Sequence, residues 1–160
     1  ISCCRGCSAC CRAQPVPVTP AEAYALWLLV ERLPEPRRTQ VRDKFADRAR
    51  RLFEAEIADA YLNRDPDLTN EQARVIARRY FSLGLACPFL GDDGACGIYT
   101  ERPFVCRQYL VTSPAELCNN PFDNPVEVLP IPIAAASAFR EVSTQFVGRE
   151  QFTIPLTLSL

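Results

Sequence analysis

Apolar side chains recur at helical spacing in the first half of the chain, and the first such stretch opens on a clear start signal. Thr19 has the position of an N-cap, Pro20 that of a first helical residue, and Glu22 that of the partner in a capping box. We expect this helix to end near Pro34. The side chains expected to face inward are Ala23, Leu26, Trp27 and Val30.

Two further stretches show the same period. From Arg37 to about Leu62 the apolar residues lie three or four positions apart, which predicts one long amphipathic helix. The next helix is expected to begin at Thr69 or Asn70, with Gln72 bonding back, and to end at Gly84. The apolar positions of the two helices are Val41, Phe45, Ala49, Leu52, Phe53, Ile57 and Tyr61, and then Val75, Ile76, Tyr80 and Leu83.

The second half of the chain has a shorter and more broken pattern. Two apolar pieces within residues 87–99 flank a Gly-Asp-Asp-Gly turn, which predicts a small hairpin or knuckle turned at Asp93-Gly94. Residues 112–132 are rich in proline and are expected to be irregular, before a helix from Ile133 to Val147 that closes at Gly148. The final alternation from Phe152 to Leu160 predicts an edge strand at best, because Pro155 cannot donate a ladder hydrogen bond.

These elements predict a mainly α fold in a single domain, in keeping with a length of 160 residues. We expect a cysteine-rich loop at 1–18, a helical insert at 19–84, a cysteine knuckle at 85–120, and a C-terminal helix and tail at 121–160. The chain begins at Ile1 and contains no methionine, so we expect a trimmed segment, and a removed targeting peptide remains open.

Composition narrows the possible functions. The formal net charge of -1 comes without a clustered basic face, so neither nucleic acid nor a membrane surface is expected as a partner. The longest apolar run, Ala25 to Val30, is far shorter than the roughly 20 residues of a membrane-spanning helix. The absence of histidine excludes Ser-His-Asp and Cys-His catalysis and histidine-bound zinc or haem. No catalytic residue is predicted, and no protein partner is indicated.

The nine cysteines carry the main chemical signal. Cys4, Cys7, Cys10 and Cys11 form the pattern C-x-x-C-x-x-C-C, and Cys87, Cys96, Cys106 and Cys118 follow much later. Thiolates are soft ligands that suit zinc, copper(I) and iron–sulfur clusters, and a C-x-x-C turn lets two sulfurs converge on one centre. Adjacent cysteines cannot easily face one tetrahedral ion, so Cys10 and Cys11 indicate two neighbouring centres or a bridging sulfur. The spacing therefore predicts a thiolate metal site that joins the loop to the knuckle.

A disulfide framework is the first alternative, but the cysteine count is odd and a core of this size needs no cross-links. A thioredoxin-like redox pair at Cys4 and Cys7 would need a preceding strand, which the pattern lacks.

Metal binding implies a reducing, cytoplasmic location. The first three motif cysteines together with Cys87-Pro88 have ferredoxin-like spacing and favour [4Fe–4S], yet eight cysteines also divide into two Cys4 zinc sites. Spacing leaves zinc and iron–sulfur open.

Arginines accompany the cysteines. A guanidinium beside bound thiolates offsets their negative charge and donates hydrogen bonds, and this role is assigned to Arg102 and Arg107 as cofactor-binding residues. Arg5 and Arg12 are interpreted as ordinary solvated side chains, because arginine is the common basic residue of this chain.

The motif of residues 4–11, together with Cys87-Pro88-Phe89-Leu90, residues 94–99 and residues 102–107, resembles the YkgJ-type cysteine-cluster family of zinc- or iron-chelating domains. The resemblance implies that seven cysteines are metal ligands, with Cys118 as a looser eighth. Those seven are Cys4, Cys7, Cys10, Cys11, Cys87, Cys96 and Cys106. Cys3 has no clear counterpart and would be a spare thiol or a ninth ligand of a multinuclear cluster.

The function implied by this resemblance is coordination of iron, as an iron–sulfur cluster, or of zinc through an all-cysteine site. The alternative is a redox or methyl-transfer enzyme or accessory, because similar clusters occur in flagellin lysine N-methylases. No Gly-rich nucleotide loop supports that reading. The C-x-x-x-C-x-x-C spacing of Cys3, Cys7 and Cys10 is interpreted as an accident of a dense cluster, since no barrel surrounds it.

Overall fold

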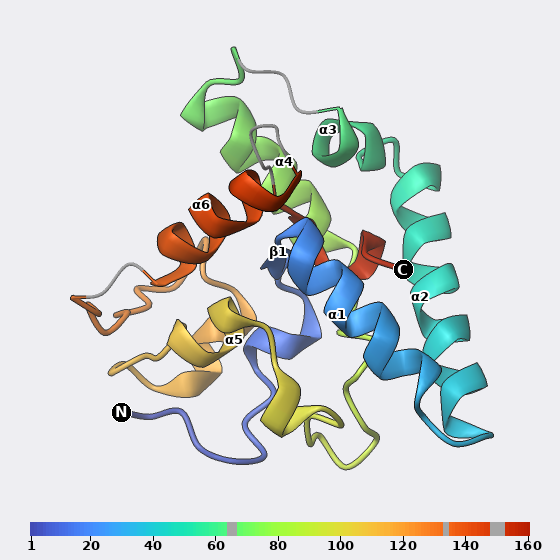
Figure 1. Ribbon diagram of the computed structural model, residues 1–160. Helices are drawn as coiled ribbons and strands as arrows, with labels where there is room; N and C mark the ends of the chain where they lie inside the picture. Colours follow the sequence, from blue (N-terminus) through green and yellow to red (C-terminus); the bar gives the residue numbers. More distant parts are fainter. Residues whose placement is uncertain (64–66, 133–134, 148–152) are drawn as a thin grey trace.

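The computed structural model describes residues 1–63, 67–132, 135–147 and 153–160, and these ranges are mainly helical, as predicted. The α-helices are α1 (Pro20–Glu31), α2 (Arg37–Glu54), α3 (Ala58–Leu62), α4 (Asn70–Ser82), α5 (Phe104–Gln108) and α6 (Ala135–Val147) (Figure 1). Short 3-10 turns are η1 (Cys10–Arg12), η2 (Tyr99–Glu101), η3 (Ala115–Asn119) and η4 (Leu156–Leu158). Among the described residues, no helix is long and apolar enough to cross a membrane.

Both predicted capping boxes are present. The Thr19 hydroxyl accepts from the Glu22 N–H, while the Glu22 carboxylate accepts from the Thr19 N–H at 2.9 Å. Thr69 and Gln72 make the same reciprocal pair at the start of α4. Gly84 lies just beyond α4 with a φ of 58°, the left-handed conformation that glycine adopts at helix ends.

The inward placement of Trp27 is wrong. Its side chain is 44% exposed and stacks on Tyr24, with ring centroids 5.7 Å apart. Leu26 and Val30, on the neighbouring side of α1, are buried instead. The apolar residues of α1 extend around more of the helix than one packed face can cover, so periodicity alone did not locate the buried face.

The single helix predicted from residue 37 to residue 62 is also wrong, because the chain breaks after α2 and restarts as α3. Glu56 has a φ of 55° at the break, and the Ile57 N–H bonds to the Leu52 carbonyl at 3.2 Å. The turn buries Ile57 and Ala58 and leaves Phe53 54% exposed. Burial of two apolar residues therefore took precedence over continued helical propensity.

The sheet consists of β1 (Pro17–Val18) and β2 (Ile154–Pro155), which are antiparallel, with Pro17 opposite Pro155. The Leu156 N–H then donates to the Val16 carbonyl at 2.7 Å. The tail does not continue as a strand beyond Pro155 but turns into η4, and Phe152 lies outside the described residues.

Residues 112–132 are irregular as predicted, apart from η3 and a bridge between Val111 and Val128. The predicted C-terminal helix is present as α6, while Ile133 and Gly148 lie outside the described residues.

Two apolar clusters hold the molecule together. The first core lies between α1, the first part of α2, β1 and the knuckle, and the second core lies between the end of α2, α3 and α4. The tail contributes to both, because Leu156 belongs to the first core, Leu158 packs on the second, and the Thr157 hydroxyl lies 2.8 Å from the Tyr80 hydroxyl. The buried members are Val18, Leu26, Val30, Val41, Phe45, Phe89, Ile98 and Leu156, and then Leu52, Ile57, Ala58, Tyr80 and Leu85.

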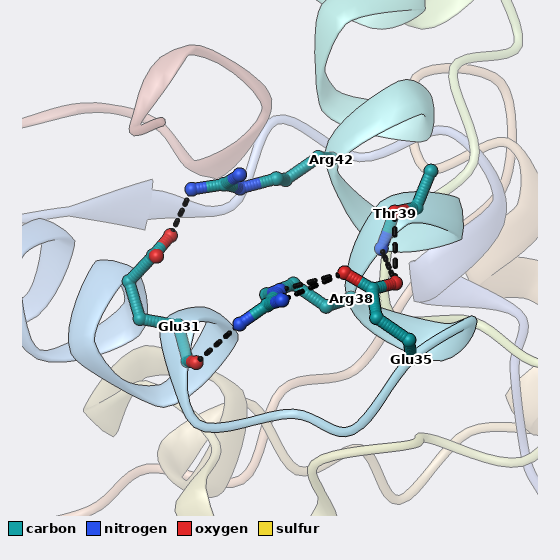
Figure 2. A network of polar contacts seen from close by, with 5 residues as sticks. All are labelled: Glu31, Glu35, Arg38, Thr39 and Arg42. Carbon is teal, nitrogen blue, oxygen red and sulfur yellow. Dashed lines mark hydrogen bonds and ion pairs between the residues drawn. The ribbon is translucent and has the colours of Figure 1, made fainter.

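A polar network fixes the connection between α1 and α2 (Figure 2). Arg42 pairs with Glu31, and Arg38 pairs with Glu35 at 2.8 Å and donates to the Glu31 carbonyl at 3.3 Å. Glu35 also accepts from the backbone N–H and the hydroxyl of Thr39, which lies in the first turn of α2. These side chains are largely exposed, so the network orients the two helices more than it stabilises them.

Candidate metal centre

The first cysteine loop is built from two tight turns. The Cys7 N–H bonds to the Cys4 carbonyl at 3.1 Å, and Gly6 between them has a φ of 90° that only glycine adopts readily. The Cys11 N–H bonds to the Ser8 carbonyl at 3.0 Å, and η1 follows. The loop therefore places its cysteines on consecutive turns rather than along an extended strand.

The predicted knuckle is present, with an isolated antiparallel bridge between Leu90 and Cys96. The Gly91 N–H bonds to the Ala95 carbonyl at 2.9 Å, and the Asp93 carboxylate accepts from the Ala95 N–H at 3.0 Å. Asp93 therefore has the turn-forming role expected for it. The knuckle turn lies against the first cysteine loop, because a Cβ at Gly94 would lie 3.6 Å from the Ser8 hydroxyl oxygen.

Two hydrogen bonds attach the cysteine segments to one another and to the helices. The Cys87 N–H donates to the Cys11 carbonyl at 2.7 Å, which joins the knuckle to the end of the first loop. The Phe104 N–H donates to the Glu22 carboxylate at 2.9 Å, which ties α5 to the capping box of α1. As a result, α5, which carries Cys106, is attached to the start of α1, and its ribbon lies beside the first cysteine loop (Figure 1).

Four thiols from three segments lie within the range of one another's charge, and we call Cys10, Cys87, Cys96 and Cys106 the inner thiol group. The pKa of Cys87 is raised to about 12, first by burial and then by the thiols of Cys106, Cys96 and Cys10. The pKa of Cys106 is also raised to about 12, first by burial and then by Cys10 and Cys96. In the metal-free protein these two thiols are therefore protonated at neutral pH.

Cys11 belongs next to this group. A hydrogen bond between the Cys10 and Cys11 side chains is the main cause that raises the pKa of Cys10, followed by burial and by the charge of Cys11. The two adjacent sulfurs therefore lie within hydrogen-bonding distance of each other.

A second set of thiols lies around η3, and we call Cys3, Cys7 and Cys118 the outer thiol group. Burial raises the pKa of Cys118, and the thiols of Cys10, Cys3 and Cys7 act in the same direction. The Val111 N–H donates to the Cys3 sulfur at 3.4 Å. Cys4 is exposed, so it is the motif cysteine most open to solvent.

The two arginines assigned to the site differ in position. The positive charge of Arg102 lowers the pKa of both Cys106 and Cys10, against the larger effects that raise them, and its guanidinium lies 3.8 Å from the Tyr99 ring centroid. Arg107 instead donates to the carbonyls of Arg102, at 2.8 Å, and Thr100. Arg102 therefore acts on the thiols through its charge, whereas Arg107 holds the backbone that carries Arg102.

The donor set suits a thiophilic metal, because the clustered side chains are sulfurs with a guanidinium nearby. Within the described residues, however, no three or more Cys, Asp or Glu side chains are arranged to hold an ion directly. The cysteine segments lie near one another, but their sulfurs do not surround a common position. Metal binding would therefore require the cysteine side chains to rotate. Rotation about χ1 moves a sulfur between staggered positions without moving the backbone.

The sequence did not indicate three contributions to this region. Glu22 was predicted as a capping residue, but its second oxygen also holds α5. Gln14 donates to the Cys118 carbonyl at 3.2 Å, and the Tyr109 hydroxyl bonds to Cys118. Only the capping role of Glu22 could be predicted, because contacts between segments far apart in the chain produce no recognisable spacing in the sequence.

Comparison with known families agrees with the chemistry of this region. The model of the CxxCxxCC family, whose description reads "Putative zinc- or iron-chelating domain", matches residues 3–125. That range contains every cysteine of the chain and α1 to α5. No curated protein and no solved structure matches this chain. Because the match covers most of the sequence, the chain belongs to the CxxCxxCC family, as its cysteine motifs implied.

Proposed function

We propose that this protein binds zinc or iron through cysteine thiolates contributed by its first loop, its knuckle and α5. One observation carries the proposal: the Cys87 N–H donates to the Cys11 carbonyl at 2.7 Å, which joins the two cysteine segments, and burial together with the thiols of Cys106, Cys96 and Cys10 raises the pKa of Cys87. The candidate ligands are Cys4, Cys7, Cys10, Cys11, Cys87, Cys96, Cys106 and Cys118, as the family motif implies. The expected location is a reducing, cytoplasmic compartment, where thiols persist.

Binding exchanges protons for metal. Each ligand thiol gives up its proton as its sulfur forms a bond to the metal, so affinity falls as the pH falls. The high pKa values of Cys87 and Cys106 mean that the metal must displace protons that the free protein holds firmly. Arg102 favours the thiolate state at Cys106 and Cys10, which supports its assignment to the site together with Arg107 as its positioning residue.

A bound metal would cross-link cysteine segments that are far apart in the sequence. Zinc would close the site with four thiolates, and iron would be held as an iron–sulfur cluster, for which the spacing of the first motif and Cys87-Pro88 is suitable. In either case, the bound group would connect the first loop to α5, which the Phe104 N–H attaches to Glu22 of α1.

The test is metal analysis on protein purified without oxygen, combined with acid-labile sulfide and a visible spectrum. Iron with sulfide and a brown colour supports the cluster form, and zinc without colour supports the closed zinc form. The variant Cys96→Ser should lower the bound metal, whereas Ser8→Ala, in the same loop but without a sulfur, should not. Wild-type protein that contains no metal and takes up neither ion under reducing conditions would overturn the proposal.

A further inference from the structure

Four basic side chains of α2 each donate a hydrogen bond to a backbone carbonyl between residues 83 and 97, the segment that contains the knuckle. The four residues are separated by 7, 4 and 3 positions. They lie on one narrow face of the helix, because these spacings add up to nearly whole turns. We call this set the basic row, and its members are Arg37, Lys44, Arg48 and Arg51.

The basic row and the carbonyls that it contacts run in opposite directions along the chain. With the donor named first, the four bonds are Arg37 to Gly97 at 2.6 Å, Lys44 to Leu90 at 3.1 Å, Arg48 to Ala86 at 3.1 Å and Arg51 to Leu83 at 2.9 Å. Segment 83–97 therefore lies antiparallel to α2, and the helix holds it at intervals along its length.

These contacts fix the backbone around the two knuckle cysteines. Ala86 directly precedes Cys87 in the chain. Leu90 forms the antiparallel bridge with Cys96, and Gly97 directly follows that cysteine. Within the described part of the chain, no backbone N–H donates to any of the four carbonyls. The basic row therefore supplies the hydrogen bonds that these backbone groups need in a folded protein.

The two central contacts of the row are sheltered from solvent. The Arg48 side chain is 20% exposed, and Lys44 is half-buried. A hydrogen bond from a cationic donor is stronger than one between neutral groups, and partial burial strengthens it further. Arg37 is exposed, and its approach depends on Gly97, because a Cβ there would lie 2.5 Å from Nη2 of Arg37. Lys44 and Arg48 are therefore the members that hold the knuckle most firmly.

We propose that the basic row positions the knuckle for metal binding, with Lys44 and Arg48 as its principal positioning residues. The inference rests on the proposed function, because it assumes that Cys87 and Cys96 bind metal. A segment that is already ordered loses less conformational freedom on binding, so a fixed knuckle backbone raises the affinity for metal. The two cysteine side chains then need only rotate between staggered positions to reach the metal.

The coupling between the row and the metal must act in both directions. If the hydrogen bond from Lys44 favours metal binding, bound metal must favour that hydrogen bond. Lys44 is the single lysine of the chain, so the reaction of its side-chain amine with an acetylating reagent reports on the row directly. Zinc should slow this reaction by up to about tenfold, the same factor by which the Lys44 contact favours metal binding.

The first experiment measures the zinc affinity of the reduced full chain, without oxygen, by competition with a coloured chelator. Lys44→Met keeps the apolar stem but removes the donor. It should weaken zinc binding about tenfold, at the lower end of the losses seen when groups that support metal ligands are removed. Lys44→Arg keeps a cationic donor and should restore most of the affinity. Arg50→Met is the matched control and should bind zinc as wild type does, because Arg50 lies on the same helix but pairs with Asp47 and Glu54.

The second experiment needs no variant, so it tests the inference even if Lys44→Met folds poorly. Wild-type protein is acetylated with and without zinc chloride, and the extent of reaction at Lys44 is measured by peptide mass spectrometry. Equal rates in the two samples would overturn the positioning role. A folded Lys44→Met with wild-type zinc affinity, or equal losses of affinity in Lys44→Met and Arg50→Met, would overturn it too. Each of these outcomes leaves metal binding itself intact, whereas a wild type that binds no zinc overturns both proposals.

Discussion

The two halves of this molecule are stabilised in different ways. The helical half, α1 to α4, supplies half of the buried residues of the first core and four of the five in the second, and it begins two of its helices with complete capping boxes. The cysteine half comprises residues 1–18 and 85–128, and in these fully described ranges the longest helical elements are the five-residue α5 and η3. The first half depends on buried apolar area, and the second depends on hydrogen bonds between distant segments.

This difference has an energetic consequence. A fully buried aliphatic or aromatic side chain contributes about 1.5–3 kcal/mol to folding, whereas a typical hydrogen bond contributes only about 0.5–1.5 kcal/mol. The cysteine half contributes Val18, Phe89 and Ile98 to the first core and Leu85 to the second, but it forms no separate apolar cluster among the described residues. We therefore expect the helical half to keep its helices when metal is absent, whereas the cysteine half should depend on its thiolates being tied together.

Removal of metal should produce the largest effect, and it should affect the two halves differently. Structural zinc contributes on the order of 10 kcal/mol to folding, so a chelator should loosen the cysteine half and make the peptide bonds after Arg12 and Arg107 more accessible to trypsin. Sites in α2, such as Arg48, should stay protected, and far-UV circular dichroism should keep most of its helical signal. Uniform digestion of both halves, or none, would show that the halves do not differ in this way.

Leu52→Ala should produce the next largest effect, this time in the helical half. Leu52 is fully buried in the second core, and such a truncation costs about 2–5 kcal/mol of unfolding free energy. The neighbouring variant Phe53→Ala is the control, because that ring is more than half exposed and should cost far less. Urea denaturation measures both, and equal losses would contradict the position of the second core.

Two tyrosines at the second core allow a test of how buried hydroxyl groups affect the stability of the helical half. The Tyr80 hydroxyl is paired with Thr157, whereas the Tyr61 hydroxyl is buried without a partner among the described residues. Tyr80→Phe should therefore destabilise the fold by about 1–3 kcal/mol, because it leaves the Thr157 hydroxyl unpaired. Tyr61→Phe should be neutral or stabilising, and thermal melts of the two variants should differ in sign or clearly in size.

The same tyrosines predict instability at alkaline pH. Burial raises the pKa of Tyr61 to about 12, and burial also raises the pKa of Tyr80, against the hydrogen bond to Thr157 that lowers it. A folded-state pKa above the unfolded value of 10 gives stability that is complete below pH 10 and is lost as the pH rises through the folded pKa. Unfolding monitored together with tyrosinate absorbance should therefore begin above pH 10, and Tyr61→Phe should reduce the pH dependence.

The smallest effect is expected at the connection between α1 and α2. Arg42→Ala removes the ion pair with Glu31, but the Arg42 side chain is more than half exposed. Exposed pairs contribute about 0–1 kcal/mol, so the midpoint of urea unfolding should barely move. A large loss would mean that the network in Figure 2 is part of the stabilising framework of the helical half.

The sequence predicted those features whose signals are local. Thr19 with Glu22 gave the start of α1 to the residue, Thr69 with Gln72 gave the start of α4 to within one residue, and Asp93-Gly94 gave the knuckle. The break after α2 was missed because nothing near Glu56 in the sequence marks a turn, and only the packing of Ile57 and Ala58 favours it. Trp27 was misplaced because the apolar residues of α1 cover more than one face.

For the candidate site, the sequence predicted which residue types would bind metal, but it did not predict which of those residues lie close together. Cysteine spacing predicts ligands, yet it cannot show that the charge of Cys10 acts on the thiols of both Cys106 and Cys118, because that effect depends on tertiary packing such as that of η1 against η3. Likewise, Arg102 and Arg107 have similar positions in the sequence, but only Arg102 places its charge on the thiols. Tertiary packing, which has no local signature, determines both results.

The tail that touches both cores also sets an order of events during synthesis. Ile154 pairs with Val18, and Leu156 and Thr157 complete contacts begun more than seventy residues earlier. Every cysteine therefore leaves the ribosome before the segment that closes the helical half. At a synthesis rate of about 5–20 residues per second, the thiols would spend a few seconds in a nascent chain with incomplete cores. For that interval, a cell would have to protect them from oxidation or load them with metal.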